Sequence, residues 1–386
     1  GHREISDAFS NIALGPNGAW WPKHGYLMPI ATLPFYWVFG ASGTLVFNVL
    51  SVTAVVVLSF GLASRFASQG ASAIAAFTIG LAGPHADYAY NYSNDGFYTT
   101  LVLAAFLAAI PHREESWTAD QGKWRRILAG LLLGLAVWTK ITNFLFAPLL
   151  WVAALGPALR ETDGVHRLRG AAKATLQLAL GAAIPLGLFG LANWFMFGRP
   201  WVTSYQRVLI VEGGESRVAS HAALFTVPLK DGLDDLLFTE GRGLLTRYAM
   251  TTLGWIGLGS LARDRRTRAF AGGLVVTAVV FIWFFARFKY YHERFLFPIF
   301  GLLVIPAARL IDALTQTLDR AVLTSRQRVA ALGLSIATVG AAAVGHSWLG
   351  RHHVRLSDRI EGARVYLGET RCDYFNNMRW SWECDG

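Results

Sequence analysis

Long apolar runs separated by polar connections fill most of this chain. The runs predict transmembrane helices at residues 44–62, 71–90, 97–111, 127–139, 141–156, 174–197, 244–262, 269–286, 295–310 and 329–348. Several are shorter than the roughly 20 residues that cross a bilayer, so tilting, local thinning or a water-filled cavity must make up the difference. The pattern predicts an all-α polytopic membrane protein with about ten transmembrane helices.

Composition agrees with this class. Hydrophobic residues make up 53% of the 386 positions and charged residues only 16%, which lies outside the range of soluble globular proteins. The formal net charge of +10 is ordinary for loops near anionic lipid, and no nucleic-acid-binding motif accompanies it. We therefore expect membrane lipid, and no nucleic acid, among the partners.

Residues 124–156 are too many for one membrane helix. Because each residue adds about 1.5 Å, the 33 residues would form a helix about 50 Å long. The sequence instead predicts a hairpin with its turn at Lys140-Ile141-Thr142-Asn143. This turn places the Lys140 ammonium group at or just below the membrane surface, where a charge normally faces a polar cavity or a partner. A lysine that snorkels beside a short turn is the alternative.

The density of Lys and Arg predicts the orientation. Residues 63–70, 111–126, 157–173, 262–268 and 309–328 hold 17 of the 35 Lys and Arg residues in 68 positions. The positive-inside rule makes these connections cytoplasmic and both chain ends external. The organisation is then an external loop with an interfacial helix at 1–43, a transmembrane domain at 44–348 that includes an external loop at 198–243, and an external tail at 349–386.

The two ends of the chain carry further expectations. Cys372 and Cys384 fall in the external tail, where an oxidising compartment allows a disulfide; two free thiols are the alternative. The chain begins at Gly1 rather than Met, and no anchor precedes the polar residues 1–26. We expect that an upstream transmembrane helix is missing.

Basic residues lie in external segments where a lipid phosphate would sit. The run at 27–39 has 13 residues and two prolines, so it predicts an interfacial helix that is too short to span, with Lys23 and His24 at headgroup depth. An interfacial anchor alone would look the same. Arg242, beside glycines at a helix start, and Arg294, in a later turn, offer guanidinium groups that suit an anionic phosphate.

Two acids lie in the external connection at 84–96, with no basic residue close in sequence to neutralise them. Acids beside membrane spans are costly to bury and commonly mark a functional cavity, which favours a site role for Asp87 and Asp95. Asp95 also suits a helix N-cap, and solvation alone would explain Asp87.

No cofactor follows from the sequence with certainty. Four external histidines could join Asp87 or Asp95 around a divalent ion: His24, His85, His221 and His292. Their spacing matches no recognised metal motif, so a divalent metal stays an open alternative.

The order of several motifs over residues 18–312 resembles the GT-C membrane glycosyltransferases. The motifs are Trp21-Pro22-Lys23-His24-Gly25 before a short apolar helix, Ser93-Asn94-Asp95-Gly96 opening a span, Val137-Trp138-Thr139-Lys140, Asn193-Trp194-Phe195-Met196-Phe197-Gly198-Arg199-Pro200, Gly243-Leu244-Leu245 and Glu293-Arg294-Phe295-Leu296-Phe297-Pro298. Within that superfamily the chain is similar to the bacterial relatives of the dolichyl-phosphate-mannose-protein mannosyltransferases and the aminoarabinose transferases, the family 39-like enzymes.

This resemblance implies an activity and its acids. The activity is an inverting transfer of a sugar from a polyprenyl monophosphate carrier to a protein, lipid or glycan acceptor on the outer face of the cell membrane. The general base would lie in the first external loop, where Glu4 and Asp7 are the only acids, or in the missing upstream residues. Asp95, with Asp87 as a second candidate, would occupy the second acidic position, which orients the site or holds a metal.

The resemblance also implies which cations meet the carrier phosphate. Lys23 matches the family's phosphate-contacting residue, with Arg242 and Arg294 as further candidates. Their predicted position near the membrane surface adds His24 and Lys140 to this set.

Two other classes of function stay open. A lipid or solute transporter would also place charges within the membrane, although the halves of this chain contain no internal repeat of the kind common in transporters. A structural or assembly subunit is the third hypothesis. It predicts that Lys23, Asp95 and Arg294 can each be replaced by Ala without loss of activity.

Overall fold

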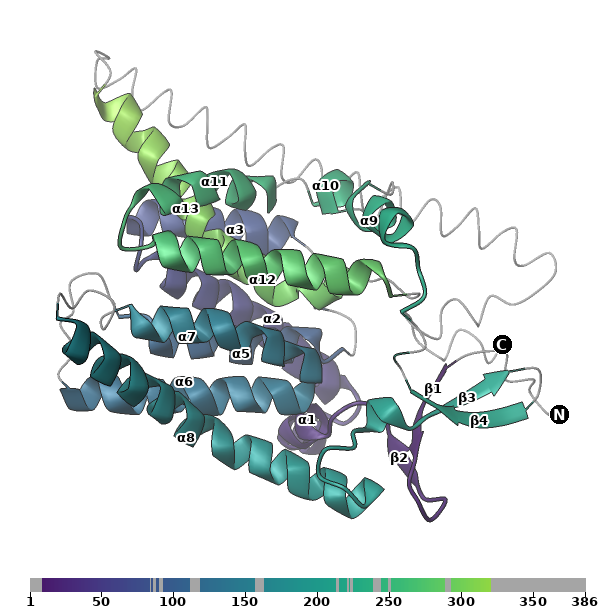
Figure 1. Ribbon diagram of the computed structural model, residues 1–386. Coiled ribbons are helices and arrows are strands. Elements are labelled where there is room, and N and C mark those ends of the chain that lie inside the picture. The colour runs from purple at the N-terminus through teal and green to yellow at the C-terminus, as the bar shows by residue number, and fades with distance from the viewer. Residues whose placement is uncertain are drawn as a thin grey trace, which may run out of the picture.

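The computed structural model describes residues 9–83, 85, 88–89, 93–111, 119–156, 163–212, 215–220, 222, 225–238, 244–248, 251–288 and 293–320. Helices that lie side by side dominate it (Figure 1). Within these ranges four helical stretches are long and apolar enough to cross a membrane: Ser42–Ala63, Gly164–Phe197, Arg268–Ala286 and Arg294–Thr317. The chain therefore has the helical membrane-protein character that its apolar pattern predicts.

Most of the helices follow the predicted apolar runs, but α9 (Leu229–Phe238) falls in the segment predicted as an external loop at 198–243. In chain order they are α1 (Leu27–Phe39), α2 (Ser42–Ala63), α3 (Gln69–Ala82), α5 (Asp95–Ala109), α6 (Ala119–Thr139), α7 (Ala147–Leu155), α8 (Gly164–Phe197), α9 (Leu229–Phe238), α10 (Leu244–Arg247), α11 (Thr252–Arg263), α12 (Arg268–Ala286) and α13 (Phe297–Arg320). The described residues also form the short 3-10 helices η1 (Ile141–Phe146), η3 (Ser204–Gln206) and η6 (Glu293–Leu296). The first nine predicted runs overlap helices, and the run at 329–348 lies outside the described residues.

The sequence predicts one helix at 244–262, but the structure has two helices there. The short helix α10 ends at Arg247, and α11 begins at Thr252. Between them the Thr251 backbone N–H and hydroxyl both donate to the Tyr248 carbonyl, which closes a turn. The polar residues in this run offer the backbone alternative hydrogen bonds, and they interrupt the helix.

The basic connections adjoin one end of the helix bundle. The C-terminal ends of α2, α5, α7, α11 and α13 lie together at this end, on the left of Figure 1. The strands, α1 and α9 lie at the opposite end. The described helix ends that lead into the basic connections are therefore grouped in space.

A four-stranded antiparallel sheet stands where the sequence predicts external loops, and it corrects the all-α prediction. Its order is β2 (Trp20–Pro22), β1 (Phe9–Leu14), β3 (Val208–Glu212) and β4 (Glu215–Ala219). Ala13 pairs with Trp21 on one side and with Val208 on the other. The sheet therefore joins the N-terminal segment to the long connection after α8.

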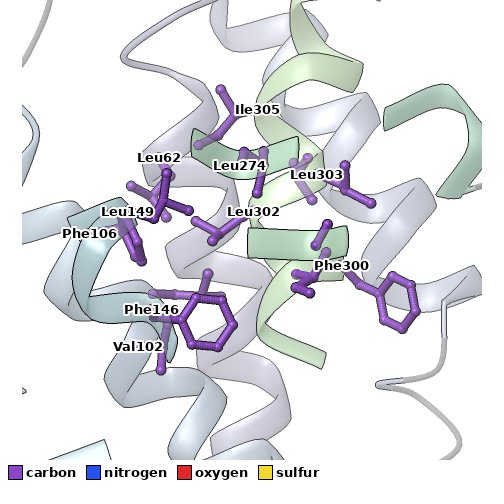
Figure 2. Close-up of a cluster of buried hydrophobic side chains, with 14 of the residues drawn as sticks. Leu62, Val102, Phe106, Phe146, Leu149, Leu274, Phe300, Leu302, Leu303 and Ile305 are labelled. Atoms are coloured by element: carbon purple, nitrogen blue, oxygen red, sulfur yellow. The ribbon is translucent and has the colours of Figure 1, made fainter. Parts of the chain in front are cut away.

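The apolar core centres on α13. This helix packs against α2, α3, α5 and α11, and its residues 299–308 are almost completely buried. Figure 2 shows Phe300 and Leu302 of α13 in one cluster with Leu62 of α2, Phe106 of α5 and Leu149 of α7. These helices form the scaffold from which the polar residues emerge at the sheet end.

Helices α6 and α8 pack with their backbones unusually close. A Cβ atom on Gly130 would lie 2.0 Å from the Leu178 carbonyl oxygen, and one on Gly181 would lie 1.9 Å from the Ile127 carbonyl oxygen. Only glycine fits such a contact, which is the usual means of close helix packing in membranes. The pair brings the C-terminal ends of both helices to the same side of the bundle as the sheet.

Candidate functional site

Asp95 is the buried centre of a charged cluster at the sheet end. It is the first residue of α5 and is 1% exposed. The Lys140 Nζ lies 3.1 Å from its Oδ1, and the Arg294 Nε lies 3.6 Å from its Oδ2. Asp95 has no basic residue nearby in the sequence, and the fold brings two cations to it from distant positions. Asp95 is not the N-cap of α5, because that position is Asn94, which makes no side-chain cap bond.

Hydroxyl groups complete the surroundings of this carboxylate. The Tyr98 hydroxyl donates to Oδ1 at 2.6 Å, and the Ser93 hydroxyl donates to Oδ2. The Tyr98 oxygen also lies 3.1 Å from the Arg294 carbonyl oxygen, which ties the start of α5 to the η6 segment. Both oxygens of Asp95 are thus engaged, so this carboxylate is suited to holding cations in place.

Lys140 reaches Asp95 because α6 ends immediately before it. Its backbone is extended, with φ −154° and ψ 115°, and η1 follows. The Asn143 side-chain amide donates to the Ala136 carbonyl at 2.9 Å and so fixes the end of α6. The Lys140 Nζ stands 3.8 Å from the centre of the Phe295 ring and 4.9 Å from that of Tyr98. Attraction to these ring faces adds to the ion pair.

A third cation comes from the loop after β2. Lys23 is 8% exposed, and among the described residues it makes no ion pair. The Ser204 hydroxyl donates to the Lys23 carbonyl at 2.6 Å, and the Tyr205 hydroxyl lies 3.2 Å from Nδ1 of His24. The η3 segment therefore contacts both the Lys23 backbone and the side chain of its neighbour His24.

Gly25 allows this loop to dock on α6. A Cβ atom at this position would lie 2.2 Å from the Trp138 carbonyl oxygen and 3.2 Å from that of Thr139. Any larger residue would push the loop away from the end of α6. The contact sets Lys23 and His24 beside the turn that carries Lys140.

The cluster carries more positive than negative charge. Burial, and next the Arg294 guanidinium, lowers the pKa of Lys23 to about 8. Burial, and next the Asp95 carboxylate, raises the pKa of Tyr205, so this phenol stays a hydrogen-bond donor. Lys23, Lys140 and Arg294 surround a single described carboxylate, and an anionic ligand would complement their excess charge.

The structure brings together most of the described residues that the sequence singles out. Lys23, His24, Asp95, Lys140 and Arg294 meet at this cluster. Four other predicted site residues lie outside the described residues: Glu4, Asp7, Asp87 and Arg242.

The histidines do not gather around Asp95. His85 is 1% exposed and its Nε2 lies 3.0 Å from the Phe297 carbonyl oxygen, while His221 and His292 lie outside the described residues. In the part of the chain that the structure describes, no group of three or more His, Cys, Asp or Glu could hold a metal. Asp95 does not fit a divalent ion, because both of its oxygens already face cations.

Several site residues escaped the sequence analysis. Tyr98 could have been found, because it lies three residues after Asp95 and so shares a helix face with it. Ser204 and Tyr205 gave no such signal. They contact residues 181 positions away, and only the fold brings them to the Lys23 loop.

Among known proteins, the chain matches solved structures by its fold but matches none by its sequence. No protein-family model and no curated sequence matches the chain. Its fold is similar to that of ArnT from Cupriavidus metallidurans in the apo state, with a TM-score of 0.53 and 14% identity over 87% of this chain and 63% of that one. ArnT bound to undecaprenyl phosphate gives a TM-score of 0.50, 14% identity, and coverage of 88% and 62%.

A second protein has a similar fold. The archaeal oligosaccharyltransferase AglB from Archaeoglobus fulgidus, in complex with an inhibitory peptide and a dolichol-phosphate, gives a TM-score of 0.53 and 15% identity over 89% of this chain and 49% of that one. The chain thus spans about half to two thirds of the length of these proteins. Both belong to the GT-C superfamily, so the predicted resemblance is confirmed at the level of the fold.

Proposed function

We propose that this chain is an integral membrane glycosyltransferase that moves a sugar from a polyprenyl-phosphate carrier to an acceptor on the outer face of the cell membrane, with inversion. The observation that carries the proposal is the buried excess of cations formed by Lys23, Lys140 and Arg294 around Asp95. The shared fold with ArnT and AglB supports it, since structures of those proteins contain undecaprenyl phosphate and a dolichol-phosphate.

The proposed topology follows the loop charges. About ten helices cross the plasma or inner membrane, with the basic connections inside and the sheet end outside. Residues 1–43, 198–243 and 349–386 are external in this arrangement. The site then lies at the outer membrane surface, where the phosphate of a lipid carrier resides.

The cations have a direct chemical role in the proposed reaction. An acceptor hydroxyl oxygen attacks the sugar C1 from the face opposite the phosphate, the C1–O bond to phosphate breaks, and the hydroxyl proton passes to a carboxylate. Negative charge grows on the leaving phosphate, and cations that are already in place stabilise it without reorganising. Lys23 supplies the least neutralised charge, while Asp95 positions Lys140 and Arg294.

Asp95 is poorly suited to be the base in this scheme. Its oxygens face two cations and accept hydrogen bonds from Ser93 and Tyr98, and each of these contacts favours the form without a proton. We assign the base to another acid, with Asp87, Glu4 and Asp7 as the candidates in this sequence.

The proposal is tested by lipid binding to the purified protein in detergent micelles. Undecaprenyl phosphate should raise the unfolding temperature, and the neutral undecaprenol should not, because only the former brings an anion to the cluster. Lys23→Gln should abolish the difference, whereas Lys173→Gln, an exposed lysine on α8 near the opposite end, should keep it. Equal stabilisation by both lipids, or by neither, would refute the proposal and favour a transporter.

A further inference from the structure

A half-buried arginine lies between α6 and α8, at the edge of their close contact. Arg126 and Gln177 each lie four residues before one of the two glycines at which these helices approach, Gly130 and Gly181. The Arg126 Nη1 donates to the Gln177 side-chain oxygen at 3.0 Å. Four residues make about one helical turn, so this bond lies one turn from the glycine contact. It lies on the side of the basic connections, which is called the basic end below.

The contact with Gln177 does not neutralise the guanidinium group. Gln177 is buried in the face of α8 that meets α6, and its amide oxygen carries no net charge. The Arg126 Nε is buried, and in the described part of the chain it has no hydrogen-bond partner. Arg126 also forms no ion pair with a described residue. A partly buried charge with only a neutral partner lowers stability, and an anion at the exposed part of the guanidinium would offset this cost.

The residues before Arg126 indicate that it lies at the level of the lipid headgroups. Lys123 and Trp124 precede it on α6 by three and two residues, and both are exposed. The Lys123 Nζ stands 5.2 Å from the centre of the Trp124 ring. Tryptophan and basic residues together are typical of the boundary between hydrocarbon and headgroups. Lys123 therefore adds a second positive charge at about this level.

The surface of α8 beyond Gln177 is apolar. Leu180 and Ile184 follow Gln177 by three and seven residues, so they lie near the same side of the helix. Their side chains are 54% and 64% exposed. An anion that carries apolar chains would contact both the cations and these side chains, whereas a free phosphate would contact only the cations.

We propose that Arg126, oriented by Gln177, binds the phosphate of an anionic membrane phospholipid in the leaflet at the basic end. The phosphate supplies the negative charge that the guanidinium lacks, and the acyl chains cover Leu180 and Ile184. Basic pockets between membrane helices are known to bind anionic headgroups in this way. This site lies at the opposite end of the bundle from the cluster around Asp95, and it does not depend on the proposed function.

The test measures lipid binding to the full chain, delipidated in dodecyl maltoside. The probes are dioleoyl phosphatidylglycerol, which is anionic, and dioleoyl phosphatidylcholine, which has no net charge. The wild-type protein should bind the anionic lipid about tenfold more tightly. Arg126→Gln should weaken its binding by about tenfold, the effect of one hydrogen bond to a charged group. Arg263→Gln, an exposed arginine in the last turn of α11 at the basic end, is the matched control and should leave this binding unchanged.

Gln177→Glu is the more specific variant, because it preserves the shape of the side chain and keeps Arg126. The introduced carboxylate takes the place of the lipid phosphate as the partner of the guanidinium. The lipid-free protein should therefore unfold at a higher temperature than the wild type, and the preference for phosphatidylglycerol should fall about tenfold. If Arg126→Gln does not fold, this variant tests the site independently.

Several results would overturn the inference. The wild-type protein could bind both lipids equally, Arg126→Gln and Arg263→Gln could weaken binding equally, or Gln177→Glu could keep the full preference, as expected of a purely structural hydrogen bond. Equal stabilisation by inorganic phosphate would mean that the ligand is not a lipid. Lys23→Gln should not weaken phosphatidylglycerol binding; if it does so as much as Arg126→Gln, the anionic lipid binds at the cluster around Asp95 instead.

Discussion

Removing the Asp95 carboxylate should destabilise the protein more than removing either of its cationic partners. In Asp95→Ala, the buried Lys140 ammonium would keep, among the described residues, only the Tyr98 hydroxyl at 3.4 Å and the faces of the Phe295 and Tyr98 rings. Loss of one partner of a buried ion pair typically costs about 3–5 kcal/mol. We expect a loss in that range for the free energy of unfolding.

Lys140→Met should cost less. This change leaves Asp95 with Arg294 and with the hydroxyl donors Ser93 and Tyr98, so the carboxylate keeps three of its four partners. The expected loss is about 1.5–3 kcal/mol, the worth of a hydrogen bond to a charged group. Because both changes remove the same interaction, the double variant should cost about 2 kcal/mol less than the sum of the two single variants.

The assay is unfolding in mixed micelles of dodecyl maltoside and dodecyl sulfate, followed by far-ultraviolet circular dichroism. Asp163→Ala is the control: this acid caps α8 at its N-terminus and its side chain is 55% exposed, so the change should cost only about 1 kcal/mol, the worth of a helix cap. The reasoning fails if Asp95→Ala costs no more than Lys140→Met. It also fails if the cost of the double variant equals the sum of the two single costs to within about 0.5 kcal/mol.

Three further predictions concern the Lys23 loop. Gly25→Ala should weaken undecaprenyl phosphate binding at least tenfold, because its Cβ would lie 2.2 Å from the Trp138 carbonyl oxygen; Gly70→Ala, with nothing within 4 Å, should not. Ser204→Ala should weaken the same binding about threefold to tenfold by removing the 2.6 Å bond to Lys23, and unchanged affinity would contradict this. Because the Lys23 pKa falls from 10.5 to about 8 on folding, the unfolded chain keeps the proton that the folded protein loses between these values. Rising pH should therefore increase the free energy of unfolding but weaken phosphate binding across this window. Both quantities should be measured as a function of pH, and in the control Lys23→Gln neither should change across the window.

The helices could be predicted because their limits are local. The apolar run at 27–39 is the helix α1, Leu27–Phe39, and the turn predicted at Lys140 separates α6 from η1. A change from apolar to polar residues, or a proline, marks such limits in the sequence itself.

The charge pairing could not be predicted in this way. Asp95 has no cation close to it in sequence, and its ion-pair partner Lys140 is 45 residues away. The two meet because α5 begins and α6 ends at the same end of the bundle, which is a property of the packed helices. The sequence shows which charged residues are unusual beside an apolar run, but only the fold decides which of them form ion pairs.

The sheet is different, because its signal was present and was overlooked. Val208-Leu209-Ile210-Val211 is a short run of mostly β-branched residues, and Gly213-Gly214 follows it after one residue. Such a run before two glycines is typical of a β-hairpin, and Glu212 indeed pairs with Glu215. The all-α prediction assigns this segment to a loop, and the pairing of β3 with β4 corrects it.

The excess of buried cations is the feature that stability alone does not explain. One carboxylate offsets part of the charge of Lys140 and Arg294, but among the described residues Lys23 has no ion-pair partner, and Arg294 opposes it. A buried, unneutralised ammonium group lowers stability. Such an arrangement is expected where a ligand supplies the missing negative charge, because binding then relieves repulsion that the empty protein must tolerate. The same reasoning separates the tasks of the acids in the proposed reaction: a carboxylate that already faces two cations is a weak proton acceptor, so we expect the base to be a second acid.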